Sequence, residues 1–290
     1  MSNSYDPQVL RKLQLCELEI LKDFIEVCEK NNLVYFGFWG TGIGALRHGG
    51  FIPWDDDIDL VMPRADYEKA MEILERDYAD KYAVVSADRY DTYHVLNTHI
   101  VLKGSTFILP EEKHFDYPRG IFLDIFPLDY TSQDETERLK HLRKLWLYSK
   151  LLILKHVPFP PLPFKGIKGK IAHCVTAIAW FFLNLFCISH KFLYNLCIKE
   201  STRFNASDTG LYAYGATTSI GKNLFYKDRI FPLKKLPFED TEIPFPNDLE
   251  ESLTRVYGDF MQIPPVDKQI NHCPDVLAFP SEKAEKISKS

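Results

Sequence analysis

The stretch RHGGFIPWDDDIDLVMPR, residues 47–64, places four aspartates within five positions. They are Asp55, Asp56, Asp57 and Asp59, and apolar residues stand on both sides of them. Unpaired carboxylates in an apolar setting repel one another and resist the loss of water. A solvated acidic loop or a helix cap is the alternative, but neither needs the apolar frame. The stretch therefore predicts a metal site.

The acidic run leads into a predicted strand, DIDLVM, residues 57–62. Alternate residues of a strand share a face, so Asp57 and Asp59 point the same way. The apolar residues Ile58 and Leu60 then face the core. The strand thus presents two carboxylates together on its polar face.

A second strong strand, GIFLDIFPLD, is predicted over residues 120–129 and closed by Pro127. Phe122, Asp124 and Phe126 share one face of it. If the two strands are neighbours, Asp124 lies beside the earlier pair of aspartates. Three carboxylates form an all-oxygen site, which suits Mg²⁺ or Mn²⁺ and not zinc. Such a site is typical of metal-assisted phosphoryl transfer.

Hydrophobic periodicity and turn residues place the other elements. We expect an amphipathic helix, a buried strand, a Gly-Thr-Gly turn and a short helix at residues 9–30, 33–39, 40–42 and 43–48. A further helix begins at Pro63. The part after residue 201 is rich in proline and turns, and it contains a helical run over residues 248–261 that ends near Gly258. The last ten residues are expected to fray.

The composition excludes several classes of protein. The chain has 290 residues, of which 46% are hydrophobic, so it can form a packed core and is not a disordered protein. Its six cysteines form no C-x-x-C pair, which disfavours a zinc cluster. The N-terminus MSNSYDPQVLRKLQ has no apolar core of a secretory signal. We therefore expect reduced thiols and a cytoplasmic location.

The net charge of −5 conceals a basic segment. Residues 138–199 contain eleven Lys or Arg and no Asp or Glu, whereas the remainder has 24 basic and 40 acidic residues. Within this segment, residues 171–188, IAHCVTAIAWFFLNLFCI, carry no formal charge and follow three lysines, Lys165, Lys168 and Lys170. Basic residues on both sides fit a helix lying on an anionic membrane surface better than one crossing it. The alternative is a core helix of a helical insertion, and nucleic acid is a poor partner for so acidic a remainder.

Three blocks of this sequence resemble the LicD family, which includes fukutin-related protein and belongs to the nucleotidyltransferase superfamily. They are FWGTGIGALRHGGFIPWDDDIDLVMPRADYEK, GIFLDIFPLD and DLEESLTRVYGDFMQIPP. The likeness runs from about residue 33 to residue 265, with the middle poorly covered. It implies an α/β (α+β) fold, in which a nucleotidyltransferase-like mixed sheet is flanked by helices. We expect a catalytic core over residues 1–135, a helical, basic and apolar insertion over 136–200, and a C-terminal part over 201–290 that completes the catalytic domain.

The resemblance also implies roles for the site residues. Asp57 and Asp59 would hold Mg²⁺ or Mn²⁺, and Asp124 would complete the metal site or accept the proton of the acceptor hydroxyl. Gly40 and Thr41 would lie at a phosphate-binding turn, with Thr41 where the superfamily usually has serine. The chain also has His99 and Val101 at positions where many relatives are expected to be basic. Which charged group of the donor or acceptor contacts this region is therefore left open.

Several other residues are candidates for substrate binding. Arg47 and His48 could contact donor phosphates, since arginine pairs bidentately with them, or could lie at the surface. Trp54, with Trp39, could form an aromatic box for a quaternary ammonium group, or both could pack in the core.

Two further features of the sequence have alternative interpretations. His272 and Lys268 could close over the donor or lie at the surface. The stretch VPFPPLPF, residues 157–164, is interpreted as a stiff connector in preference to a polyproline ligand.

The resemblance implies a Mg²⁺-dependent transfer of phosphocholine, or a related phospho-alditol group, from a CDP-linked donor. The acceptor would be a hydroxyl of a cell-surface glycan, such as a lipid-linked precursor of lipopolysaccharide or teichoic acid, and CMP would leave. The enzyme would work as a peripheral protein at the cytoplasmic face of the membrane. The alternatives are a nucleotidyltransferase that passes on the nucleotide itself, and a catalytically silent membrane adaptor.

Overall fold

A computed structural model describes residues 5–160, 162, 166–217, 220–280 and 285–286. At its centre is a mixed sheet with the strand order β1-β2-β6-β4-β3. These strands are β1 (Phe36–Gly37), β2 (Asp59–Pro63), β6 (Phe122–Tyr130), β4 (Thr98–Leu102) and β3 (Tyr82–Val85). Strands β2 and β6 run parallel, whereas the pairs β1–β2, β4–β6 and β3–β4 are antiparallel. The two strands predicted to carry the aspartates are therefore neighbours.

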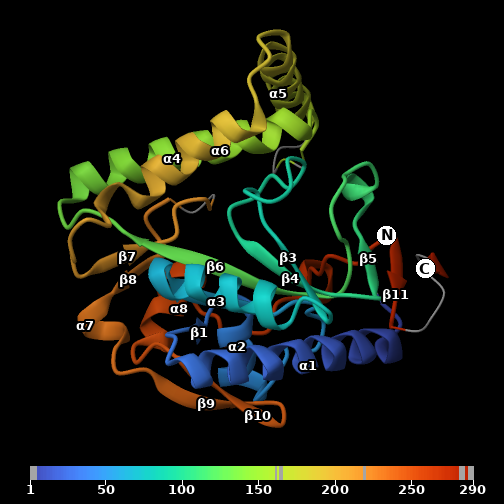
Figure 1. Cartoon of the computed structure of the whole chain (residues 1–290), viewed down its shortest axis with the longest axis vertical. Coiled ribbons are helices and arrows are strands. Elements are labelled where there is room, and N and C mark those ends of the chain that lie inside the picture. Colours follow the sequence, from blue (N-terminus) through green and yellow to red (C-terminus); the bar gives the residue numbers. More distant parts are fainter. Residues whose placement is uncertain (1–4, 161, 163–165, 218–219, 281–284, 287–290) are drawn as a thin grey trace.

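Helices of the N-terminal part pack against this sheet (Figure 1). They are α1 (Pro7–Asn31), α2 (Trp39–His48) and α3 (Arg64–Asp77). Asp6 caps α1, because its side chain accepts hydrogen bonds from the backbone of Gln8 and Val9. The apolar stripe of α1, which includes Leu13 and Phe24, is buried as its periodicity predicts.

The strand and turn predicted before the acidic run are wrong in extent and type. Only Phe36 and Gly37 pair with β2, and Trp39 already begins α2 with a φ of 44°. The Gly-Thr-Gly segment is thus the first turn of a helix and not a loop. A tight approach fixes this helix, since a Cβ on Gly44 would lie 2.3 Å from the carbonyl oxygen of Gly50.

Pro127 does not close β6, which continues to Tyr130. The reason is the change of antiparallel partner along this edge. Strand β4 pairs with β6 only as far as Ile125, and β7 (Leu211–Ala213) pairs with it from Asp129 onward. Pro127 lies between these two partners, so its missing N–H interrupts neither antiparallel ladder.

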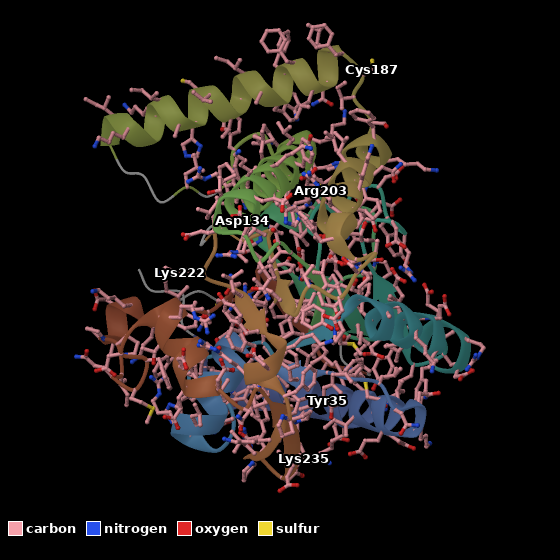
Figure 2. The ribbon with its side chains drawn as sticks, turned by 90° about the vertical axis from the view of Figure 1, so that its left-hand side faces the viewer. Tyr35, Asp134, Cys187, Arg203, Lys222 and Lys235 are labelled. Carbon is pink, nitrogen blue, oxygen red and sulfur yellow. The ribbon has the colours of Figure 1, made fainter. Side chains whose placement is uncertain are left out.

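The segment between β6 and β7 forms a helical projection made of α4 (Glu135–His156), α5 (Gly166–Leu185) and α6 (His190–Ser201). In Figure 2 the chain leaves the sheet near Asp134 and returns near Arg203, while Cys187 lies at the top of the view, just past the C-terminal end of α5. A buried network joins the projection to the core. Asp129 of β6 accepts hydrogen bonds from Nε and Nη2 of Arg64 at 2.9 and 2.5 Å. It also accepts hydrogen bonds from the side chains of Ser201 and Asn205. Lys165 and part of the 157–164 stretch lie outside the described residues.

The C-terminal part adds strands to the sheet and covers the N-terminal elements. Strand β8 (Leu224–Tyr226) pairs with β7, and β9 (Lys234–Phe238) forms a hairpin with β10 (Thr241–Phe245). Its other elements are α7 (Lys227–Ile230), α8 (Leu249–Tyr257), β11 (Val276–Ala278) and β12 (Glu285–Lys286), of which β11 pairs with β5 (Thr106–Ile108). Helix α8 ends at Gly258 as predicted. The prediction of a mixed α/β fold is confirmed.

Candidate metal centre and transfer site

The three predicted carboxylates meet at the start of β2 and β6. Asp59 pairs in register with Asp124 across the parallel strands. One carboxylate oxygen from each of Asp57, Asp59 and Asp124 lies within 4.8 Å of the others. The residues between the acids, Ile58 and Leu60, are fully buried, as the alternation predicts. The strand periodicity therefore identified the cluster correctly.

The first turn of α2 lies against this cluster. The hydroxyl of Thr41 accepts the backbone N–H of Asp59 at 2.8 Å, which ties the helix to the first residue of β2. A Cβ on Gly40 would lie 2.7 Å from the carboxylate of Asp55, so only glycine allows this approach without a shift. The free N–H groups at the start of a helix favour a phosphate. The structure therefore places Gly40 and Thr41 in the first turn of a helix beside the carboxylates, and their contact with a phosphate stays a prediction.

The electrostatics of the cluster fit a divalent cation. Burial, then the charges of Asp57 and Asp124, raise the pKa of Asp59 well above its usual value. Burial, with the charges of Asp56 and Asp124, raises the pKa of Asp57 to about 6 although His272 opposes the shift. The carboxylates therefore repel one another and attract either protons or a cation. Because all three ligands are oxygens, Mg²⁺ or Mn²⁺ suits them.

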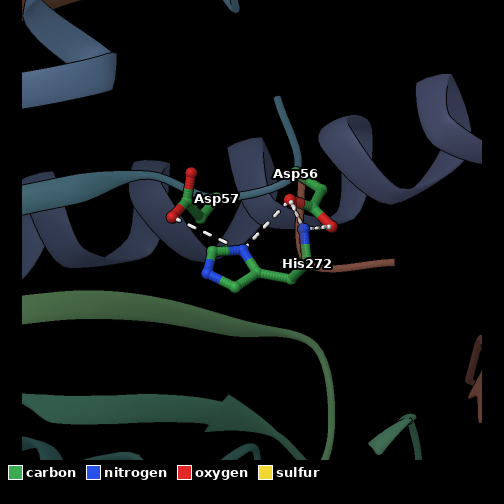
Figure 3. A group of neighbouring side chains, drawn as sticks. All are labelled: Asp56, Asp57 and His272. Carbon is green, nitrogen blue, oxygen red and sulfur yellow. Dashed lines mark hydrogen bonds and ion pairs between the residues drawn. The ribbon is translucent and has the colours of Figure 1, made fainter. Parts of the chain in front are cut away.

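Asp56 has a structural role that the sequence analysis missed (Figure 3). It is fully buried and accepts hydrogen bonds from the hydroxyl of Tyr5 at 2.6 Å and from the backbone N–H groups of His272 and Cys273 at 3.0 and 3.1 Å. It ties the N-terminal and C-terminal segments to the acidic run. The only sequence signal is that Asp56 lies between Asp55 and Asp57 and so falls outside their alternation.

His272 lies at the candidate site. Its Nδ1 is 3.1 Å from Asp56 and 3.8 Å from Asp57 (Figure 3), although its side chain is 47% exposed. Burial opposes the charged form, but the hydrogen bond to Asp56 and the charges of Asp57 and Asp56 outweigh it and raise the pKa of His272 to about 10. The imidazole is therefore a cation at neutral pH. His272 thus lies at the candidate substrate site, and its closure over the donor stays a prediction. Lys268 lies in a short 3₁₀ helix, Val266–Lys268, and is exposed.

Asp124 is held by two side chains of the β4 region. Asn97 donates to its Oδ1 at 2.6 Å, and Nε2 of His99 lies 3.1 Å from the same atom. His99 thus contacts the candidate metal ligand directly. Asn97 was not predicted, because the stretch before β4 shows no regular pattern.

Glu17 is a further unforeseen neighbour of the acidic run. It is fully buried on the apolar face of α1, and within the described residues its two carboxylate oxygens have no hydrogen-bond partner. Burial and the charges of Asp56 and Asp57 raise its pKa well above the usual value, which favours its protonated form. Its place on the apolar stripe of a helix is the signal that could have identified it.

Arg47, His48 and Trp54 form a separate group at the far end of α2. Arg47 donates to the carbonyl oxygen of Phe260 at 2.7 Å and to the ring of His48 at 2.9 Å, and its guanidinium lies 5.7 Å from the Trp54 ring centre. Trp39 packs elsewhere, on Phe126, with ring centres 4.7 Å apart. The structure thus places the two tryptophans in different surroundings. Contacts of this group with the donor remain predictions.

A cavity of about 250 Å³ opens beside Asp124 and His272. Strands β4 and β5, the stretch before β4 and the segment leading into β6 enclose it. Its other lining residues are mainly aromatic and apolar: Tyr93, His94, Val95, Asn97, His99, Val101, Phe107, Leu109, Glu112, Tyr117, Pro118, Arg119, Gly120 and Phe122. Val101, which stands where a basic residue was expected, is thus part of an apolar wall. The cavity provides space for a substrate group next to the carboxylates.

Comparison with known proteins gives one family and a small set of relatives. The profile of the family described as "LicD/FKTN/FKRP, nucleotidyltransferase domain" matches residues 32–169. The lipopolysaccharide cholinephosphotransferase LicD of Haemophilus influenzae is 28% identical over 278 residues, which cover 91% of this chain and 95% of that protein. Uncharacterized proteins of Rickettsia typhi and Rickettsia prowazekii are 30% and 32% identical over 46% and 44% of this chain, and 40% and 47% of their own lengths. The family match covers the acidic run, β6 and the lining of the cavity apart from His272.

Proposed function

This chain belongs to the LicD family, and we propose that it is a phosphotransferase that moves phosphocholine from a CDP-linked donor to a hydroxyl of a cell-surface glycan. The observation that carries the proposal is the in-register pairing of Asp59 with Asp124, which gathers three carboxylates beside a cavity. The near full-length similarity to a lipopolysaccharide cholinephosphotransferase supports this reaction class and a glycan acceptor.

In the proposed reaction, the acceptor oxygen attacks the phosphorus of the phosphocholine group. A new oxygen–phosphorus bond forms, the bond to the bridging oxygen of the donor breaks, and CMP leaves with that oxygen. We assign the acceptor proton to Asp124, because this residue belongs to the carboxylate cluster and also lines the cavity. Asn97 and His99 fix its orientation.

Asp57, Asp59 and Asp124 would hold Mg²⁺, which supplies charge neutralisation to the phosphates and to the leaving CMP. The N-terminus of α2 at Gly40 and Thr41 offers backbone N–H groups to the same phosphates. Protonated His272 adds a positive charge 3.8 Å from Asp57. Positioning and charge neutralisation are most of what phosphoryl transfer requires.

Product analysis tests this function directly. The purified protein is incubated with Mg²⁺, CDP-choline and a lipopolysaccharide precursor, and the products are separated by mass spectrometry. Free CMP and a glycan that has gained phosphocholine are expected. A nucleotidylated acceptor with released pyrophosphate would establish the rival nucleotidyltransferase, and no turnover of CDP-choline, CDP-glycerol or CDP-ribitol would favour a silent adaptor.

Helix α5 supports a location at a membrane. Only Gly169 of this helix is buried, which favours a membrane-surface helix over the core-helix alternative. Exposed apolar side chains recur every three or four residues along it: Ile167, Ile171, Val175, Ile178, Phe182 and Leu185. By length and hydropathy it is, in the described part of the chain, the helix that could cross a membrane.

We propose that α5 lies on an anionic membrane at its cytoplasmic face and does not span it. Lys168 and Lys170 stand at its start and Lys191 just beyond its end, and the surrounding segment has no acidic residue over positions 138–199. Cations at both ends suit an interfacial helix with its apolar face in the lipid. This location would bring the site to a lipid-linked acceptor.

A further inference from the structure

Five aromatic rings line the cavity beside Asp124 and form a continuous chain of contacts. We call this chain the ring wall; it consists of Phe107, Phe122, His99, Tyr93 and Tyr117. Phe107 meets Phe122 edge to face at 5.3 Å, and Phe122 stacks on His99 at 4.1 Å. His99 then meets Tyr93 at 5.2 Å, and Tyr93 meets Tyr117 at 5.3 Å, both nearly perpendicular. Rings at right angles around one hollow present faces and edges from several directions.

Two carboxylates line the cavity. Glu112 lines it and is held by the hydroxyl of Tyr117 at 3.0 Å and by the backbone of Leu109 at 3.3 Å. Asp124 is the other carboxylate that lines the cavity. Two cationic side chains also line the cavity: Arg119, whose guanidinium donates to the carbonyl oxygen of Glu112 at 2.6 Å, and His272, whose Nδ1 lies 3.1 Å from Asp56. Arg119 is thus engaged in fixing the segment that carries Glu112.

Tyr93 gives a second, independent indication of a ligand. Its side chain is 2% exposed, and within the described residues its hydroxyl has no hydrogen-bond partner. A buried polar group without a partner costs free energy. A cation beside the ring compensates for this, because it interacts with the electron-rich ring and oxygen without itself needing a directional hydrogen bond.

We propose that the ring wall receives the trimethylammonium group of the phosphocholine donor. This inference rests on the proposed function and adds the site that recognises the transferred group. The phosphate would lie at the carboxylate cluster, and the short ethylene link of choline would place the ammonium in the adjoining cavity. Aromatic faces with a nearby carboxylate are the surroundings that suit a quaternary ammonium.

This assignment differs from the aromatic box predicted from Trp39 and Trp54. The ligand chemistry is the same, but neither tryptophan lines the cavity. A sugar ring of the acceptor is the other group that aromatic rings bind. Because a sugar is uncharged, a test of charge preference separates the two occupants.

The test measures donor binding by calorimetry in the presence of Mg²⁺ and without an acceptor. The probes are CDP-choline, its uncharged 3,3-dimethylbutyl analogue of the same shape, and CMP. The wild-type protein should bind CDP-choline about tenfold or more tightly than the analogue, since a desolvated cation–π contact is worth roughly 2 kcal/mol. Phe107→Leu and Tyr117→Leu should each reduce that preference severalfold and leave CMP binding unchanged.

Tyr90→Leu is the matched control. The Tyr90 ring contacts Tyr117 at 6.4 Å from outside the cavity lining, so its loss should preserve the charge preference. Glu112→Gln, which keeps the shape of the side chain, provides a variant in case a leucine substitution prevents folding. It should also lower the preference for the charged donor.

The two proposals can fail separately. Equal binding of CDP-choline and its uncharged analogue by a wild-type protein that transfers phosphocholine would overturn the ring wall and leave the function standing. A charge preference that Tyr117→Leu removes, in a protein that transfers no phosphocholine, would support the ring wall and overturn the function. A rise in the acceptor KM of Phe107→Leu with unchanged donor binding would assign the cavity to the acceptor and overturn the inference.

Discussion

Asp59 and Asp124 stand directly opposite each other on the parallel strands β2 and β6. The backbone pairing therefore holds two carboxylates together, and Asp57 adds a third on the same side. Such a cluster is unfavourable on its own, since its members are half-buried (Asp57 and Asp59) or buried (Asp124) and repel one another. The register of the sheet therefore holds the repelling carboxylates together at the position where a bound cation would neutralise them.

The first prediction concerns the metal ligands. Asp57→Asn and Asp59→Asn should each lower kcat at least about 100-fold, because each removes part of the charge that positions the metal and the phosphates. EDTA should abolish turnover, and Mg²⁺ or Mn²⁺ should restore it. Asp240→Asn, at an exposed aspartate that pairs with Lys22, is the control and should keep full activity. Near-normal turnover of either ligand variant would contradict the metal site.

The second prediction is an inverse dependence of stability on pH in the metal-free protein. The pKa values of Asp57 and Asp59 are raised in the folded state, so folded protein binds protons more tightly than unfolded chain does. The free energy of unfolding should therefore rise as the pH falls from about 7.5 to about 5.5. His272 adds a slope of the same sign, because its pKa is about 10 in the folded state and near 6.5 in the unfolded chain, and this contribution levels off below about pH 6.5.

Thermal unfolding in EDTA or in saturating Mg²⁺ measures this effect. Mg²⁺ should raise Tm and flatten the pH dependence, because the cation takes the place of the protons. Asp59→Asn should have a higher Tm than the wild type in EDTA and a smaller increase with Mg²⁺. A wild-type Tm that is insensitive to both pH and Mg²⁺ would contradict the electrostatic account of the cluster.

Sequence reasoning predicted the carboxylate cluster because strand alternation is a strong local rule. The period of two fixes which side chains share a face, and the buried Ile58 and Leu60 confirm it. It failed at Gly40 and Thr41, where glycines that suggest a turn instead permit close packing of a helix. Tertiary contacts, here the approach of Gly44 to Gly50, outweighed local preference.

The ring wall and the clamp around Asp56 could not be predicted in the same way. The rings come from strands β4, β5 and β6 and from irregular segments around them, and their arrangement depends on long-range pairing. Asp56 acts through residues more than 200 positions away, at His272 and Cys273. No local period carries such information.

The third prediction concerns Asp124. Asp124→Asn should lower kcat at least about 100-fold, since it removes a proton acceptor and a candidate metal ligand. Binding of CMP should change less than kcat, because Asp57 and Asp59 remain to hold the metal beside the phosphate. Asn97→Ala, which removes the hydrogen bond that orients Asp124, should give a smaller loss in kcat. A larger effect on CMP binding than on kcat would assign Asp124 to nucleotide binding.

The fourth prediction concerns the clamp at Asp56. Asp56→Ala should lower the free energy of unfolding by about 3 kcal/mol, because it leaves buried hydrogen-bond donors of Tyr5, His272 and Cys273 without their acceptor. Denaturant unfolding measures the loss, and limited proteolysis near residue 272 should become faster. Asp240→Ala, at an exposed position, should change stability by less than about 0.5 kcal/mol. Equal stability of Asp56→Ala and wild type would contradict a structural role.

The last prediction concerns the membrane. A basic residue near an anionic surface contributes about 1 kcal/mol, and the exposed apolar stripe of α5 adds to this. The protein should bind anionic vesicles at low salt and detach at high salt, as screening requires. Replacing Lys165, Lys168 and Lys170 together with glutamate should weaken vesicle binding at least about 100-fold, since three such contributions are lost. Turnover of a soluble acceptor should be unchanged.

The matched control replaces Lys222, Lys234 and Lys235 with glutamate. It makes the same change in net charge, and Lys235 lies at the opposite end of the molecule from Cys187 and the tip of α5 (Figure 2). This variant should keep most of its vesicle binding, because its charges lie away from the proposed contact. Equal release of both triple variants would mean that vesicle binding depends on net charge alone. Association that persists at high salt until detergent is added would mean that α5 inserts deeply and does not lie on the surface.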